Sequence, residues 1–170
     1  MKMQKIFLIA AVLLLAGTLA AAGCVGSDNT AKDGDTISVY YSLSVNGTEI
    51  QSNFNTSAPL KFTIGAGQTI AGFNNGVIGM KIGEIKTITV SPEEGYGTYS
   101  KNNTQTMKLS DAETTLEKTL SVGDKVQLNY GQYTGEVISI DRDNDTMVLA
   151  INHYLAGETL TFTIKLLEIN

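Results

Sequence analysis

Two neighbouring stretches decide the fold of this chain: GAGQTIAGFNNGVIGMKIGE at residues 65–84 and VSPEEGYG at residues 90–97. In the first stretch Ile70, Phe73 and Val77 have helical spacing, so we expect a helix within residues 68–81 that presents one apolar face. The glycines and asparagines between them are poor helix formers. The helix should therefore be short and held by packing against a core rather than by propensity.

The residues around these stretches show the period-two alternation of β-strands, with turn residues between the runs. The expected strands are residues 36–45, 48–51, 60–64, 84–90, 126–130, 135–141, 146–151 and 159–169. Asn46-Gly47 joins the first two strands, and this dipeptide predicts a tight hairpin. We expect residues 99–105 to form a polar loop and residues 111–118 to form a turn or two of helix, with Asp111 as the candidate cap.

The composition of the 170 residues argues against several kinds of site. A hydrophobic fraction of 42% with 17% charged residues is typical of a globular protein. One Cys and one His cannot build a disulfide scaffold or a zinc site of the usual kind, so no metal or other cofactor is expected. The formal charge of −5 argues against nucleic acid as a partner, because surfaces that bind nucleic acid carry a basic stripe.

The sequence contains no motif for covalent or metal catalysis. Residues 141–145, DRDND, resemble the first half of a calcium loop, but Thr146 and Asn152 stand where an EF-hand needs Gly and Glu. A solvated hairpin turn is the better interpretation. His153 has no Gly-x-Ser-x-Gly elbow to serve, and we expect it to make a backbone hydrogen bond in a loop. Any chemistry must then come from shape and desolvation.

The N-terminal residues are set apart from the fold. Residues 6–22 are apolar or small and follow two lysines, which is typical of a signal segment. The run ends in LAAAGC at residues 19–24, which resembles the lipobox of prokaryotic lipoproteins and implies a signal at residues 1–23 and a lipidated Cys24. An uncleaved anchor helix, with Cys24 incidental, is the alternative. Both place the protein outside the cytoplasm on a membrane, joined to it by a flexible tether at residues 24–34.

The two stretches quoted first resemble the central signature of FKBP-type peptidyl-prolyl isomerases. Residues 152–157, NHYLAG, resemble the linker through which the chain returns in the SlyD type of this family, where a small chaperone domain is inserted in the flap. The resemblance implies an α+β fold, with an antiparallel sheet wrapped on one short helix. It divides the chain into an FKBP-like domain at residues 35–99 and 153–170 and a mainly β inserted flap domain at residues 100–152.

The resemblance also implies a pocket that grips a proline ring. Phe73 would form its floor, where many members of the family have Trp, and the hydroxyl of Tyr96 would meet the substrate carbonyl. Thr69 would bond the substrate through its backbone. Gln51 stands where the family usually has Asp, which weakens the polar side of the pocket. The walls would be Tyr41, Ile50, Leu60, Ile70 and Phe162.

These residues predict a peptidyl-prolyl cis-trans isomerase that acts as a monomer on unfolded or proline-containing polypeptides outside the cytoplasm. The apolar residues of 100–152 exceed what a domain of about 50 residues can readily bury, which favours a second, chaperone function for this insert. Two alternatives share the fold: a holdase in which Gln51 has silenced catalysis, and a surface lipoprotein that binds peptides or solutes.

Overall fold

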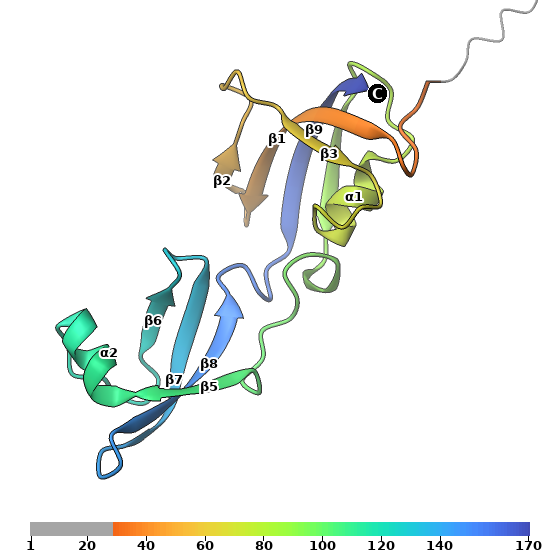
Figure 1. Cartoon of the computed structure of the whole chain (residues 1–170). Coiled ribbons are helices and arrows are strands. Elements are labelled where there is room, and N and C mark those ends of the chain that lie inside the picture. Colours follow the sequence, from red (N-terminus) through yellow and green to blue (C-terminus); the bar gives the residue numbers. More distant parts are fainter. Residues whose placement is uncertain (1–28) are drawn as a thin grey trace, which may run out of the picture.

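The computed structural model of the chain describes residues 29–170, which form two antiparallel β-sheets with short helices (Figure 1). The first sheet contains β1 (Thr36–Val45), β2 (Thr48–Ser52), β3 (Leu60–Thr63), β4 (Ile85–Val90) and β9 (Leu160–Ile169). The second contains β5 (Thr104–Lys108), β6 (Lys125–Leu128), β7 (Tyr133–Asp141) and β8 (Thr146–His153). The helices are α1 (Ala71–Val77), the 3₁₀ turn η1 (Pro92–Glu94) and α2 (Leu109–Leu116). This is the α+β fold that the sequence predicts.

The chain completes the first sheet only at its last strand. The strand order is β2-β1-β9-β4, and β3 pairs with the first residues of β1 while β2 pairs with the last. The second sheet, in the order β5-β8-β7-β6, is built wholly from the chain between β4 and β9. Figure 1 shows the two sheets as separate lobes, joined by the segment that follows η1 and the segment that precedes β9. We call them the first and second lobes.

Alternation along β1 and β9 places one face of the first sheet in a core. Every second residue at the start of β9 is buried, from Leu160 to Leu166, and the residues between them are partly exposed. This confirms the predicted period-two pattern. The core of the first lobe also takes in apolar residues of β1, β3, β4 and α1: Ile37, Val39, Leu43, Phe62, Phe73, Val77 and Val90.

Helix α1 is shorter than the predicted span of residues 68–81. It begins after Ile70 and ends before Ile78, and both of these residues have extended backbone. No side chain caps its N-terminus. Phe73 and Val77 are buried on the face that meets the sheet. The packing of this face, rather than the intrinsic preference of the residues, therefore holds the helix, as expected for a segment so rich in Gly and Asn.

Two glycines of α1 allow the helix to lie very close to β4. A Cβ atom on Gly72 would come within 2.3 Å of Cγ1 of Val90, and one on Gly76 within 2.3 Å of Cδ1 of Ile88. The backbone carbonyl of Gly76 also accepts a hydrogen bond from Nζ of Lys86 on β4, at 2.9 Å. The glycines that weaken the helix in isolation are thus the residues that let it pack.

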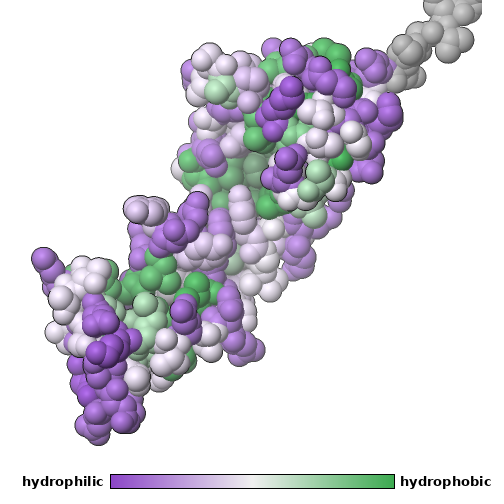
Figure 2. All heavy atoms as spheres, in the orientation of Figure 1, coloured by the Kyte–Doolittle hydropathy of each residue, from purple (hydrophilic) through white to green (hydrophobic). Residues whose placement is uncertain are grey.

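The second lobe has a core of its own, formed by six buried residues: Leu109, Leu120, Val126, Val137, Met147 and Leu149. Figure 2 shows hydrophilic residues covering the far end of this lobe, where the β7–β8 hairpin turns. At that turn the carboxylate of Asp141 accepts hydrogen bonds from the backbone N–H groups of Asp143 and Asn144, each at 3.1 Å. These bonds confirm the hairpin turn predicted at residues 141–145.

The prediction that Asp111 caps α2 is wrong. The residue at the N-cap is Lys108, which makes no capping hydrogen bond, and Asp111 lies within the first turn. The carboxylate of Asp145, from the β7–β8 turn, instead accepts bonds from the backbone N–H of Ser110 at 2.8 Å and from its hydroxyl at 2.7 Å. A residue distant in sequence therefore does for this helix what a local cap would do.

Strand β5 begins inside the segment predicted as a polar loop, residues 99–105. Its residues pair with β8 along their whole length, from Thr104 opposite Ala150 to Lys108 opposite Thr146. Four of its five side chains are exposed. A strand at the edge of a sheet with so little buried surface has no apolar alternation, so the pattern that identified the other strands was absent here.

Residues 30–34 pack on the first lobe, although the sequence predicts a flexible tether there. Ala31 is 1% exposed, donates its N–H to the carbonyl of Met80 at 2.9 Å and accepts a bond from Gly79 at 2.7 Å. The predicted signal at residues 1–23, and Cys24, lie outside the residues that the structure describes. Between residues 29 and 170, no helix has both the length and the apolar character needed to cross a bilayer.

The contact between α1 and β4 is tested by comparing Gly72→Ala with Gly76→Ala. The new methyl of Gly72→Ala meets the stiff, branched side chain of Val90, so we expect the free energy of unfolding to fall by about 1–3 kcal/mol. In both variants alanine favours the helix by about 1 kcal/mol, but the methyl of Gly76→Ala meets the end of the Ile88 side chain, which can rotate. The free energy of unfolding should therefore fall less in Gly76→Ala than in Gly72→Ala. Urea denaturation measures both, and equal losses would contradict the packing described.

Candidate functional site

A cavity of about 440 Å³ opens on the first lobe. Figure 2 shows apolar atoms gathered on the part of this lobe that faces the second lobe. The side chains around the cavity come from the sheet, from α1 and from the segments that precede α1 and follow η1. They are Tyr41, Leu43, Gln51, Leu60, Gly67, Gln68, Thr69, Ile70, Phe73, Tyr96 and Phe162. None of these lining residues carries a charge.

Three aromatic rings form the floor and one wall of the cavity. Phe73, on α1, is 3% exposed and meets Phe162 of β9 edge to face, with ring centroids 5.0 Å apart and planes at 75°. Tyr41 of β1 meets Phe73 at 5.8 Å and 81°. Edge-to-face pairs at these distances are favourable because the positive edge of one ring faces the negative face of the next. The contacts fix the floor in one arrangement.

Asn53 holds Tyr41 in place at the point where β1 passes from one edge partner to the other. Its backbone N–H donates to the carbonyl of Tyr41 at 3.0 Å, and its side-chain Oδ1 accepts from the N–H of Tyr41 at 2.6 Å. Its amide also donates to the carbonyl of Val39 at 3.4 Å. Asn53 thus bonds the edge of β1 between the part that pairs with β3 and the part that pairs with β2. Nothing in the sequence marked this residue, because an Asn in a loop is unremarkable by pattern.

Tyr96 stands at the rim of the cavity, two residues after η1, and is 37% exposed. Burial raises the pKa of Tyr96, and the nearby phenols of Tyr154 and Tyr41 raise it further. Burial and Tyr154 likewise raise the pKa of Tyr41. Both phenols therefore remain protonated at neutral pH, and the hydroxyl of Tyr96 is available as a hydrogen-bond donor at the mouth. Tyr154 was not among the predicted site residues.

The polar side of the cavity is neutral. The side-chain oxygen of Gln68 accepts from the N–H of Thr63 at 2.8 Å and so holds the loop before α1 against the end of β3. The hydroxyl oxygen of Thr69 is buried and has no hydrogen-bond partner within the described chain. Buried polar atoms are usually paired, so this hydroxyl is one that a ligand could satisfy. Gln51 offers an amide where a carboxylate would have offered charge.

Every predicted site residue lines this cavity except Ile50. The register of β1 and β2 shifts after Leu43, so that Gln51 lies opposite Leu43 while Glu49 lies opposite Ser44. Ile50 is left without a partner at this bulge and is 42% exposed. Ile50 is therefore not among the residues that line this cavity, and its role as a wall of the pocket stays a prediction.

The structure adds three lining residues that were not predicted, Leu43, Gly67 and Gln68. Leu43 could have been found, since it lies two residues beyond Tyr41 on a strand and so shares its face. Gly67 and Gln68 precede Thr69 in the loop before α1, where no periodicity applies.

No metal centre accompanies the cavity. Among residues 29–170, no three His, Cys, Asp or Glu side chains are grouped so that they could hold a metal ion.

The Nδ1 atom of His153 accepts a hydrogen bond from the backbone N–H of Leu155 at 3.1 Å, which confirms the predicted backbone bond. The imidazole also stacks on the ring of Tyr96.

The fold and the cavity together indicate a protein that binds an apolar group in a preformed pocket. An antiparallel sheet packs on a short helix, and the two enclose an uncharged aromatic hollow with a phenol hydroxyl at its mouth. Such a hollow suits an apolar ring on an extended polypeptide, rather than chemistry by charged acids and bases.

Comparisons with known proteins identify the family. The sequence profile described as FKBP-type peptidyl-prolyl cis-trans isomerase matches residues 27–167. The chain is 32% identical over 157 residues to the short-type peptidyl-prolyl cis-trans isomerase of Methanocaldococcus jannaschii, covering 83% of this chain and 95% of that one. It is 35% identical over 104 residues to FK506-binding protein 2 of Aspergillus fumigatus, covering 55% of this chain and 78% of that one.

A third relative is the FKBP-type peptidyl-prolyl cis-trans isomerase SlyD of Helicobacter pylori, 37% identical over 110 residues, which cover 64% of this chain and 58% of that one. The chain belongs to the family of FKBP-type peptidyl-prolyl cis-trans isomerases. The resemblance of residues 65–84 and 90–97 to that family is thereby confirmed.

Proposed function

We propose that this chain catalyses the cis–trans isomerisation of X–Pro bonds in unfolded polypeptides and that the proline ring enters the cavity above Phe73. The observation that carries the proposal is the uncharged cavity itself, floored by Phe73 and Phe162 and bordered by the hydroxyl of Tyr96. In this proposal the protein acts as a monomer.

The chemistry needs no nucleophile. The barrier to rotation about a peptide bond is about 18–20 kcal/mol and comes from amide resonance. A twisted amide has lost that resonance and is less polar than a planar one, so an apolar cavity that excludes water from the bond favours it. Binding the twisted form more tightly than the planar form lowers the barrier.

Two polar groups orient the substrate in this proposal. The hydroxyl of Tyr96 donates to the carbonyl of the residue that precedes the proline, and the backbone of Thr69 bonds the chain that follows. Leu60 and Ile70 pack against the ring from the sides. Because Gln51 is neutral, the cavity has no carboxylate to orient the dipole of the rotating amide, and turnover should be modest for this family.

Tyr96→Phe tests this arrangement most simply. Loss of one hydrogen bond to the substrate should lower kcat/KM on a short X–Pro peptide by about tenfold. Phe73→Ala, which empties the floor, should abolish measurable catalysis, and circular dichroism would show whether its core survives. Ile82→Ala, at a residue 52% exposed and remote from the cavity lining, serves as the control and should match the wild type.

A protease-coupled assay measures all three variants. Unchanged turnover in both Tyr96→Phe and Phe73→Ala would refute the pocket. A wild-type chain that suppresses aggregation without any turnover would instead favour the holdase, and a chain that does neither would favour a surface protein that binds other ligands.

We propose in addition that the second lobe is an inserted domain, at about residues 100–152, that captures unfolded segments. It carries an apolar hollow of about 190 Å³ between α2 and the sheet. Two methionines, Met107 and Met147, line the hollow, and flexible Met side chains suit clients of varied sequence. Leu116 stands exposed at its edge. Capture here would raise the local concentration of prolines at the cavity of the first lobe.

Leu116→Gln should separate capture from catalysis. A polar group at the edge of the hollow should weaken suppression of aggregation of an unfolded client about fivefold, because an apolar contact is lost. Turnover of a short peptide should not change. Thr114→Gln is the matched control, since Thr114 is exposed on the same helix but does not line the hollow. Equal effects of the two variants on aggregation would argue against this site of capture.

We propose finally that the protein acts outside the cytoplasm, anchored to a membrane by lipid on Cys24 after removal of residues 1–23. The support is the apolar run at residues 6–22 and the small residues that precede the cysteine. An uncleaved anchor helix over the same run is the alternative.

Cys24→Ser decides between these two anchors. In cells that process lipoproteins, the wild type should partition with membranes at a mass that corresponds to loss of residues 1–23 and gain of lipid, and the variant should keep its leader. Membrane binding at the full, unmodified mass in both proteins would support the uncleaved anchor. Recovery of both in the soluble fraction would refute membrane anchoring.

A further inference from the structure

The ring of Tyr96, at the mouth of the cavity, stacks on the imidazole of His153, the last residue of β8 in the second lobe. The ring centroids lie 3.8 Å apart and the planes differ by 5°. Tyr133 of β7 meets the same imidazole edge to face, at 5.8 Å and 82°. The phenol at the rim of the first lobe is thus packed against a residue that the second lobe holds.

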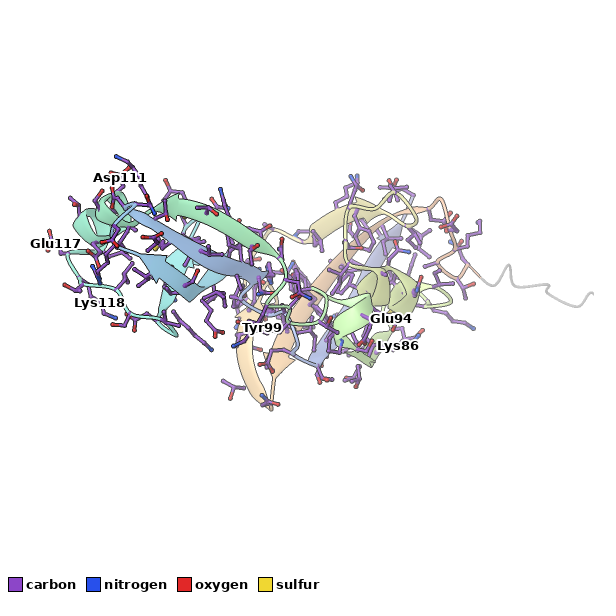
Figure 3. All side chains as sticks on the ribbon, turned by 90° about the horizontal axis from the view of Figure 1, so that it is seen from below. Lys86, Glu94, Tyr99, Asp111, Glu117 and Lys118 are labelled. Atoms are coloured by element: carbon purple, nitrogen blue, oxygen red, sulfur yellow. The ribbon has the colours of Figure 1, made fainter. Side chains whose placement is uncertain are left out.

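Three further contacts fix this junction. The side chain of Asn152, which is buried, accepts from the N–H of Ser100 and donates to its carbonyl, each at 2.9 Å. The N–H of Gly157 donates to the carbonyl of Gly97 at 2.8 Å. Tyr99, which Figure 3 labels where the chain passes between the lobes, donates its hydroxyl to Glu136 of β7. The segment that follows η1 is therefore hydrogen-bonded both to the segment that precedes β9 and to the second lobe, close to the Tyr96–His153 stack.

Tyr96 lies between Gly95 and Gly97, outside any strand or helix. The N–H groups of both glycines donate to the carbonyl of Pro92, at 3.1 and 2.7 Å, so the backbone here is held. What remains to be fixed is the direction of the Tyr96 side chain. Of the aromatic rings around Tyr96, His153 is the one that stacks on it face to face. Displacement of that ring would let the phenol swing away from the cavity.

We propose that His153 is a positioning residue for the isomerase: its imidazole holds the ring of Tyr96 so that the hydroxyl stays at the cavity mouth. This inference rests on the proposed role of Tyr96. His153 does not touch the substrate in this account. It acts through Tyr96, and because β8 carries it, the second lobe takes part in shaping the cavity of the first.

Protonation of His153 should disturb this arrangement. Its Nδ1 atom accepts the N–H of Leu155, and a proton on that atom would end the bond. The titratable groups whose rings contact the imidazole are the phenols of Tyr96, Tyr133 and Tyr154. Burial lowers the pKa of His153, so the neutral form prevails at pH 7. Activity should therefore fall as the pH drops through this lowered pKa, and should recover above it.

Two substitutions separate the two contacts of the imidazole, which are the ring stack on Tyr96 and the hydrogen bond from Leu155. His153→Phe keeps a flat ring for the stack but removes the acceptor for Leu155. His153→Asn keeps an acceptor that can bond an N–H two residues on, as Asn does in Asx-turns, but removes the ring. If the stack positions Tyr96, His153→Asn should lower kcat/KM about tenfold. His153→Phe should stay within about twofold of the wild type and lose the fall in activity on the acidic side of the lowered His153 pKa.

The opposite ranking, with His153→Asn active and His153→Phe impaired, would overturn the proposal in favour of a role in the turn alone. Thermal unfolding of each variant shows whether it is folded at the assay temperature. Tyr130→Ala, which removes a fully exposed aromatic ring from the same lobe, should leave kcat/KM of a short peptide unchanged.

A double-mutant cycle with Tyr96→Phe distinguishes failure of this inference from failure of the proposed function. If His153 acts through the hydroxyl, His153→Asn should cause no further loss in the Tyr96→Phe background, and the two effects should be non-additive. Additive effects would overturn the proposal. A normal rate for Tyr96→Phe alone would show that the hydroxyl has no catalytic role, whereas a low rate beside a normal rate for His153→Asn would refute only the positioning.

Discussion

The contact between Phe73 and Phe162 is the interaction on which the rest of the first lobe depends. For the two rings to meet, α1 must lie almost against the sheet, and this requires glycine where the helix passes Val90. The same residues that weaken the helix therefore create the cavity floor. A helix of better formers would be more stable alone but would stand farther from β4, and the hollow would lose its base.

The lining of the cavity contains no charged side chain, and this determines which ligands it suits. In the proposed function the cavity would offer a proline ring an apolar surface and offer the amide very few polar partners. Such surroundings would favour a distorted amide over a planar, solvated one. The chain belongs to a family of prolyl isomerases, and the polar lining of its cavity is neutral at Gln51. The junction at Asn152 and His153 then joins the pocket to a second lobe with an apolar hollow of its own.

Much of this could be predicted from the sequence, because buried residues alternate with partly exposed ones along most of β9 and because α1 and the segment of Tyr96 carry family motifs. What failed depended on contacts distant in sequence. Strand β5 is polar and is a strand only because β8 pairs with it. Ile50 is unpaired at a bulge that no composition signals, and it does not line the cavity. Asn53 and the partnership of Tyr96 with His153 become visible only when the chain is folded.

The most direct test of the central claim is NMR exchange spectroscopy on a peptide with a single X–Pro bond, in the presence of a small amount of the wild-type chain. Uncatalysed exchange takes tens to hundreds of seconds. If the chain is a prolyl isomerase, exchange peaks between the cis and trans resonances should appear on a much shorter timescale, with the populations of the two isomers unchanged. Exchange at the uncatalysed rate, with the chain folded and at sufficient concentration, would contradict isomerase activity.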